Sequence, residues 1–300
     1  MKVLFVLTLI IFASTSWAFY EDGDYSSGSG IESAPDGTGL ITINLVNNWP
    51  IPEGTKVLGI DYIPLWYEYH IVAYVGSGHA VYFMDADDGS AVHPGGWTLA
   101  ANNDYPFGVC HVPYVGDERL HVNDFSYDAM FSKHSATAWV EYGSLTDLMG
   151  RGLDYHAGMD KIFDLYTIDT PGAYRWLVAM FTPGQSTGST YELDCFIAAD
   201  WRGSGCCVYP MWNGNTGIAV TMYQSQWIRF FEYPGHAGDP YYSHGVIPYA
   251  VDSSYGLTYS EERDTFFHSY QTAGLYYIAE LEISEAALEA DTWAGIKSSF

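Results

Sequence analysis

The chain has 300 residues, and its 11 basic and 36 acidic side chains give a formal net charge of −25. Proteins hold phosphate backbones and anionic lipid surfaces mainly through Lys and Arg, so this charge excludes an electrostatic nucleic-acid binder and disfavours membrane surfaces. Hydrophobic residues make up 48% of the chain, which is enough for a buried core, and the 17% aromatic content with 31 glycines favours strands over helix bundles. We therefore expect an all-β protein.

The amino-terminal segment is typical of a secretory signal. Met1-Lys2 precedes an apolar run over 3–13, and Ser16-Trp17-Ala18 supplies a small-residue cleavage site. The run is too short to span a bilayer, so we expect a signal peptide over 1–18 and no membrane insertion. The protein is then secreted, to the periplasm, the medium or the cell surface. Residues 19–39 are rich in Gly, Ser and acids without apolar periodicity, which predicts a flexible leader.

A degenerate repeat follows the leader. Its clearest copy is Gly59-Ile60-Asp61-Tyr62, and anchors of this kind stand at 59, 108, 152, 196 and 245, separated by 49, 44, 44 and 49 residues. Each anchor precedes a strand that carries aromatic residues. A period in the forties, filled with short strands and Gly, Asp and Pro turns, predicts propeller blades of four strands. We expect a five-bladed β-propeller over residues 40–283.

The two ends of the predicted propeller are complementary. The fifth repeat leaves strand form soon after Ile283, one strand short, and the apolar segment 39–46 can supply that strand. Closure by an amino-terminal strand leaves no open edge in the last blade. Ser284 can cap a short helix, so we expect residues 284–300 to form a helical tail.

Three features resemble the degenerate blades of uncharacterised secreted bacterial β-propeller repeat proteins. They are the Gly-apolar-Asp-Tyr anchor, the later aromatic strand and the acidic turn over 85–89. The resemblance covers about residues 40–283, and none of its motifs is as specific as a WD signature. The ending over 292–297 is similar to Trp-Gly-x-Ile-Lys endings of secreted bacterial proteins, but Ala294 stands where those have Gly. It implies nothing about function.

Four cysteines, Cys110, Cys195, Cys206 and Cys207, are candidates for disulfides in an oxidising compartment, where they allow three full pairings. Cys206 and Cys207 are adjacent, so they can bond elsewhere or to each other. One structural disulfide with the other thiols buried is the alternative. The spacing does not match a cysteine zinc site.

The acidic turn Asp85-Ala86-Asp87-Asp88-Gly89 is the one place where the sequence suggests a cofactor, because calcium loops gather carboxylates on tight turns. The turn lacks the EF-hand register, so a solvated hairpin turn is the alternative. The ten histidines show no metal-binding spacing, and no other cofactor is expected.

The residues just after the repeat anchors are candidates for a ligand site at the mouth of the central channel. Six of them bear suitable side chains: Asp61, Tyr62, His111, Asp154, Tyr155 and Asp200. Carboxylates that converge on an axis can bind a cation or a sugar, and a pair of them can cleave a glycosidic bond. They can equally accept backbone N–H groups that hold adjoining blades together.

Aromatic residues form a second candidate surface, which includes Tyr241-Tyr242, Tyr276-Tyr277, Trp212 and the run over 230–233. Aromatic side chains anchor glycans and proteins when exposed, and they fill the space between blades when buried. The sequence therefore predicts a binding or scaffold module whose partner is a glycan or a protein. The alternative is a carbohydrate-active enzyme, a glycoside hydrolase or lyase, that uses the axial carboxylates.

Overall fold

The computed structural model describes residues 40–52, 55–66, 69–76, 80–92, 95–113, 119–124, 130–134, 138–141, 150–170, 173–185, 188–193, 203–211, 214–233 and 242–284. The chain divides into two compact units, Met1–Asp36 and Gly37–Phe300, and every described residue belongs to the second unit. The predicted signal peptide, the leader and the tail beyond Ser284 lie outside the described residues.

The regular elements of the described residues are all β-strands, which confirms the expected all-β class. Among these residues there is also no helix with the length and hydropathy to cross a membrane. The strands are β1 (Leu40–Pro50), β2 (Val57–Trp66), β3 (Tyr69–Gly76), β4 (Ala80–Asp85), β5 (Trp97–Thr98), β6 (Pro106–Val112), β7 (Arg119–Asp124), β8 (Met130–His134), β9 (Val140–Glu141), β10 (Gly150–His156), β11 (Lys161–Thr170), β12 (Ala173–Phe181), β13 (Gly188–Leu193), β14 (Gly203–Pro210), β15 (Thr216–Met222), β16 (Trp227–Tyr233), β17 (Tyr242–Val246), β18 (Ser253–Ser260), β19 (Thr265–Thr272) and β20 (Leu275–Ser284).

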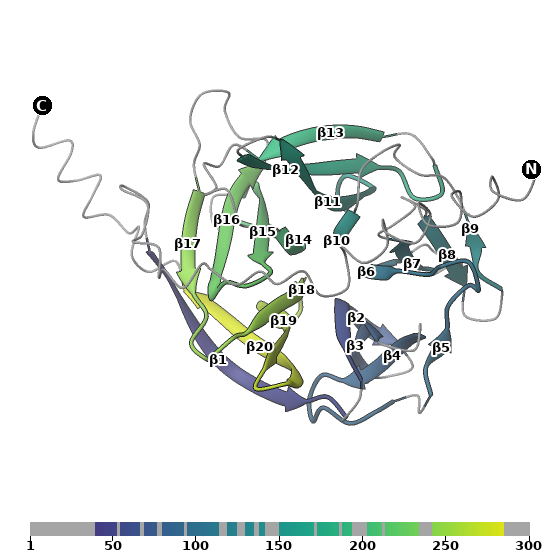
Figure 1. Cartoon of the computed structure of the whole chain (residues 1–300), viewed down its shortest axis with the longest axis horizontal. Helices are drawn as coiled ribbons and strands as arrows, with labels where there is room; N and C mark the ends of the chain where they lie inside the picture. Colours follow the sequence, from purple (N-terminus) through teal and green to yellow (C-terminus); the bar gives the residue numbers. More distant parts are fainter. Residues whose placement is uncertain are drawn as a thin grey trace, which may run out of the picture. The chain divides into compact units, whose positions relative to one another are not determined.

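The strands form three four-stranded sheets and one eight-stranded sheet. Their orders are β2-β3-β4-β5, β6-β7-β8-β9, β10-β11-β12-β13 and β14-β15-β16-β17-β1-β20-β19-β18. In the eight-stranded sheet, β1 pairs antiparallel with β20 from Thr42 to Pro50, and it pairs in parallel with β17 only at Leu40 and Ile41 (Figure 1). The first strand of the described chain therefore lies beside the last one.

Five strands, β2, β6, β10, β14 and β18, contact one another in cyclic order, with β18 returning to β2. We call them the inner strands and their arrangement the inner ring (Figure 1). Each inner strand starts a run of strands that leads outward through antiparallel neighbours. The side chains that face the axis of this ring therefore come from five separate parts of the sequence.

A glycine in each inner strand allows the next inner strand to approach closely. At Gly59, Gly108, Gly152, Gly205 and Gly256 an added Cβ would lie under 3.0 Å from an atom of the next strand around the ring. Each inner strand also shifts its register with its neighbour at or beside this glycine. A β-bulge increases the local twist of a strand, so twisted strands meet where they carry no side chain.

The sequence predicts three of these five glycines. Gly59, Gly108 and Gly152 lie in the inner ring, whereas Gly245 lies on the outer strand β17, where it pairs with Ile41 of β1. The prediction of an inner strand at Gly245 is wrong, because one glycine among apolar residues also suits the close approach of β1 and β17. The anchor at 196 lies outside the described residues. The other two ring positions belong to Gly205 and Gly256.

The apolar core lies between neighbouring sheets. One cluster joins Phe163 of β11 to Val220 of β15, and another joins Val72 of β3 to Ile278 of β20. Large flat side chains fill this space, as Phe230 and Phe231 of the predicted aromatic surface do. For those two residues the packing alternative holds.

The described cysteines form no disulfide with one another, so the disulfide pairings expected from the sequence are not confirmed. Cys110, Cys206 and Cys207 are free and buried, and Cys195 lies outside the described residues. Cys206 packs in the cluster with Val208, while Cys207 packs in a different cluster with Phe230. Successive side chains of a strand point to opposite faces, which is why two adjacent cysteines on β14 cannot form a vicinal bridge here.

Candidate functional site

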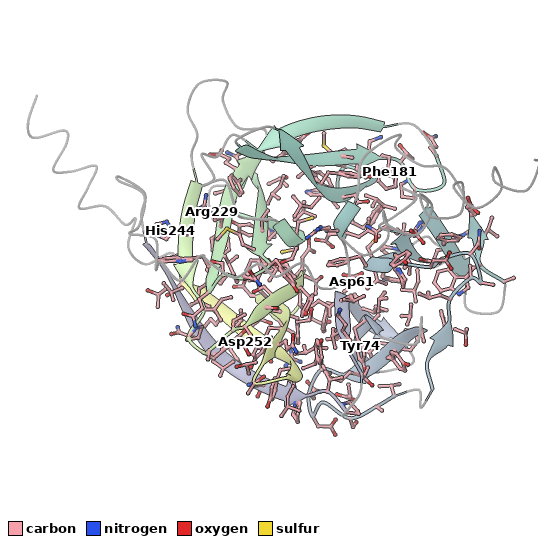
Figure 2. The ribbon with its side chains drawn as sticks, viewed as in Figure 1. Asp61, Tyr74, Phe181, Arg229, His244 and Asp252 are labelled. Atoms are coloured by element: carbon pink, nitrogen blue, oxygen red, sulfur yellow. The ribbon has the colours of Figure 1, made fainter. Side chains whose placement is uncertain are left out.

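The second residue after each inner-ring glycine is buried near the axis. These residues are Asp61, Cys110, Asp154, Cys207 and Thr258, and none of them is more than 6% exposed. Figure 2 places Asp61 near the centre of the inner ring. Two of the predicted site residues, Asp61 and Asp154, therefore occupy equivalent positions, with Cys110 between them in the ring.

Asp61 connects three inner strands. Its Oδ1 accepts the Thr258 hydroxyl of β18 at 2.8 Å and the backbone N–H of Tyr62 at 2.9 Å. Its Oδ2 accepts the backbone N–H of His111 on β6. Both carboxyl oxygens are therefore engaged with the strands on either side of β2.

Asp154 repeats this arrangement two strands further around the ring, on β10. Its Oδ2 accepts the backbone N–H of Val208 on β14 at 2.7 Å, and its Oδ1 accepts that of Tyr155 at 2.9 Å. In both cases the carboxylate bonds the third residue after the glycine of a neighbouring inner strand. These contacts match the alternative in which the axial aspartates hold adjoining sheets together.

Burial and hydrogen bonding act on these carboxyls in opposite directions. Burial raises the pKa of Asp61 from 3.8 to about 7, against the three hydrogen bonds, which lower it. Burial also raises the pKa of Asp154 well above its ordinary value, and the nearby charge of Asp61 raises it further. Ionising one of the two carboxyls therefore makes it harder to ionise the other.

Two of the other predicted site residues, Tyr62 and Tyr155, contact residues outside the inner strands. The Tyr62 ring stacks on Phe267 of β19, with ring centroids 5.4 Å apart. The Tyr155 hydroxyl donates to Asp160 in the turn after β10 at 3.0 Å. The structure thus brings Asp61 to the backbone of His111, but it does not gather the predicted side chains around one ligand position. Asp200 lies outside the described residues.

His111 contributes its backbone rather than its imidazole to this arrangement. Burial lowers the pKa of its imidazole to about 4, so the ring is neutral at physiological pH. A neutral imidazole in this position adds no charge to the neighbourhood of Asp61.

The axis is almost filled at the level of the glycines. A gap here is lined by residues of four inner strands, among them Gly59, Gly108, Gly152, Gly256 and Arg151, and it is too narrow for a water molecule. A ligand at this level would have to separate the inner strands.

The carboxylates of the acidic turn do not converge. Asp85 accepts the backbone N–H of Asp87, and Asp88 accepts that of Ser90, each at 2.8 Å. Asp87 pairs with Arg263 at 2.6 Å. Within the described ranges no group of three or more His, Cys, Asp or Glu side chains is placed to hold a metal ion. Calcium at this turn stays a prediction.

Sequence reasoning missed a cluster of tyrosines where the inner strands begin. Tyr255 contacts Tyr223 and Tyr276, with ring centroids 5.8 and 5.9 Å apart, and the Lys56 ammonium lies 6.0 Å from the Tyr255 ring. Of the aromatic surface expected from the sequence, Tyr276 belongs to this cluster. Tyr277 stacks on Tyr270 instead. No sequence signal points to this cluster, because the three tyrosines are far apart in the chain and Tyr255 precedes a glycine, Gly256, that is not one of the repeat anchors.

The sequence matches no protein-family model and no curated protein. The structure is similar to glutaminyl cyclase of Myxococcus xanthus (11% identity, TM-score 0.53), covering 83% of this chain and 100% of that one. It is also similar to a GH43_1 enzyme of Xanthomonas citri (10% identity, TM-score 0.54), covering 81% and 92% of the two chains. An auxiliary nutrient binding protein of Bacteroides thetaiotaomicron covers 82% of this chain and 76% of its own length, at 12% identity and a TM-score of 0.47.

The sheets around the inner ring and the similarity to the first two structures define the protein as an all-β chain with a propeller-like fold. At such low identity the similarity extends to the fold alone, because the same fold carries unrelated activities. A function has to be argued from the residues of this chain.

Proposed function

We propose that the chain is a five-bladed β-propeller, closed by β1, and that it works as a secreted binding or scaffold module rather than as an enzyme. Support for five blades comes from the five inner strands, each of which leads a run of four strands once β1 is counted with β18, β19 and β20. The predicted signal over residues 1–18 supports secretion.

The observation that carries the choice against catalysis is the state of Asp61 and Asp154. Glycoside cleavage needs two carboxyl groups that flank the scissile bond, with room for the sugar between them. Here both carboxyls are buried, and each accepts backbone N–H groups of a neighbouring strand. This geometry suits a role in holding the inner strands together. The ligand of the proposed module would then bind at a surface at one end of the ring.

The test is a thermal-shift screen of the chain against neutral and acidic oligosaccharides, with calcium and with a chelator. We expect at least one saccharide to raise the unfolding temperature and to be recovered intact after long incubation. Products of cleavage or elimination would support an enzyme and overturn the proposal. The chelator arm tests calcium separately, since loss of stability on chelation would support a bound ion at the acidic turn.

A further inference from the structure

The beginning of the inner strands, which we call the entry end, collects side chains from several connections. Gly203 of β14 pairs with Met222, so the turn after β15, which contains Tyr223, lies beside the start of β14. Ser253 of β18 pairs with Gln271, which brings the turn between β19 and β20 to the same end. Antiparallel pairing therefore places Tyr223, Tyr255 and Tyr276 together, although they are far apart in sequence.

Tyr255 is the buried member of this cluster. It is 3% exposed, and its hydroxyl donates to Gln271 at 3.3 Å. Tyr223 and Tyr276 are half-buried, and both contact its ring. Lys56, just before β2, is exposed, and its ammonium lies over the Tyr255 ring. The cluster thus combines aromatic surface with hydrogen-bonding groups at its edge.

An exposed carboxylate adds an acceptor near this end. Asp252 is labelled in Figure 2, among the strands β18, β19 and β20. It accepts the backbone N–H of Ala273, in the turn between β19 and β20, at 2.7 Å. Donor and acceptor groups therefore both occur within a few residues of the tyrosines. A sugar hydroxyl both donates and accepts hydrogen bonds, whereas the C–H face of a pyranose ring packs on an aromatic ring.

The net charge of the chain favours uncharged saccharides over charged ones as ligands. A chain with a charge of −25 repels a polyanion at long range, and Asp252 adds a negative group at the entry end. A cationic ligand would compete with Lys56 for the face of Tyr255. An uncharged ligand meets neither obstacle.

We propose that the tyrosine cluster of Tyr223, Tyr255 and Tyr276, with Lys56, binds an uncharged oligosaccharide at the entry end of the ring. This inference rests on the proposed binding function and names its site and ligand class. Tyr223 and Tyr276 supply stacking surface, and Lys56 donates to sugar hydroxyls.

The test is calorimetric titration of the chain with neutral gluco-, manno- and xylo-oligosaccharides and with an oligogalacturonate. We expect a neutral oligosaccharide to bind, and Tyr276→Ala and Tyr223→Ala each to weaken that binding about tenfold, the scale of one lost stacking contact. Lys56→Met, at an exposed position, should weaken it about threefold, which is the loss of one hydrogen bond. Tyr259→Ala, whose hydroxyl donates to Asp264 in the turn at the other end of β18, should leave binding unchanged.

The outcomes separate this inference from the proposed function. A neutral oligosaccharide that binds equally well to all four variants would overturn the site and leave the binding function standing. Tighter binding of the oligogalacturonate, or no binding of any saccharide, would overturn the ligand class. Near-ultraviolet circular dichroism of each variant, matched to the parent chain, establishes that lost binding is not lost folding.

Discussion

At the scale of single residues, Asp61 joins three inner strands, β2, β6 and β18. Its partner Thr258 is 197 residues away in sequence, and its other cross-strand partner, the N–H of His111, belongs to the next sheet. A buried donor that loses its acceptor costs its full desolvation free energy. The contribution of Asp61 to stability therefore exceeds that of one ordinary hydrogen bond.

We predict that Asp61→Ala lowers the free energy of unfolding by about 2–4 kcal/mol, because the His111 N–H and the Thr258 hydroxyl lose their acceptor. Chemical denaturation followed by tryptophan fluorescence measures this loss. The control is Asp88→Asn in the exposed acidic turn, which should cost much less stability than Asp61→Ala because Asp88 is fully exposed. Equal losses for the two variants would contradict a special role for Asp61.

The pH dependence of the same site has a defined sign. Burial raises the pKa of Asp61 in the folded chain from 3.8 to about 7, so the folded state holds this proton more tightly than the unfolded state. The stabilisation from the protonated form is complete below about pH 4 and is lost as pH rises toward 7. The destabilisation caused by Asp61→Asn should therefore be larger at pH 4.5 than at pH 8. A penalty that grows with pH would contradict this assignment.

At the scale of elements, β1 is fastened to the last strands by a charged network as well as by its ladder. Glu280 of β20, 1% exposed, accepts hydrogen bonds from Asn47 of β1 at 2.6 Å and from Arg263 at 2.8 Å. Arg263 also reaches Asp87 in the turn after β4. One arginine thus ties together the closing strand, the turn between β18 and β19, and the first sheet.

We predict that Arg263→Met lowers the free energy of unfolding by about 3 kcal/mol, because it leaves the Glu280 carboxylate buried without its cation. Chemical denaturation measures the loss. The double variant Arg263→Met/Glu280→Met should recover most of it, since no charge then remains buried. Asp87→Asn, on the exposed side of the network, should cost less than about 1 kcal/mol. A double variant less stable than Arg263→Met would contradict this account.

The contribution of this network to the stability of the folded chain also depends on pH. Although burial raises the pKa of Glu280, its hydrogen bonds to Arg263, Asn47 and Thr265 bring it below the ordinary value of 4.5. A lowered carboxyl pKa stabilises the folded chain above the unfolded pKa, and this stabilisation is lost as pH falls. Glu280 and Asp61 therefore act in opposite directions on the acid side.

At the scale of the whole molecule, the inner ring buries three thiols. Cys110, Cys206 and Cys207 are at most 1% exposed, and burial raises the pKa of each thiol. The thiolate is the reactive form, so both effects protect these cysteines while the ring is closed.

We predict that Cys110, Cys206 and Cys207 resist alkylation in the native chain and react fully in denaturant without any reductant. Mass spectrometry of peptides after iodoacetamide treatment measures both states. Native labelling at the rate of a free cysteine would show that the ring opens readily. A requirement for reductant in denaturant would show that these residues form disulfides.

Part of this architecture can be predicted from the sequence because it depends on local patterns of residues. Alternating apolar residues and the recurring Gly59, Gly108 and Gly152 predict strands and a repeat, since strand periodicity and glycine at a close approach depend on near neighbours in sequence. The alternative role of the aspartates, as acceptors of backbone N–H groups between sheets, was also available from the sequence.

The sequence alone determined an acidic, all-β chain built from a repeat, because composition and strand periodicity are local properties. Only the tertiary structure decided that Gly205 and Gly256 complete the inner ring, that Asp61 meets Thr258, and that three tyrosines meet at the entry end. Those contacts form when the ring closes, and closure brings together residues whose separation in sequence carries no signal of their proximity.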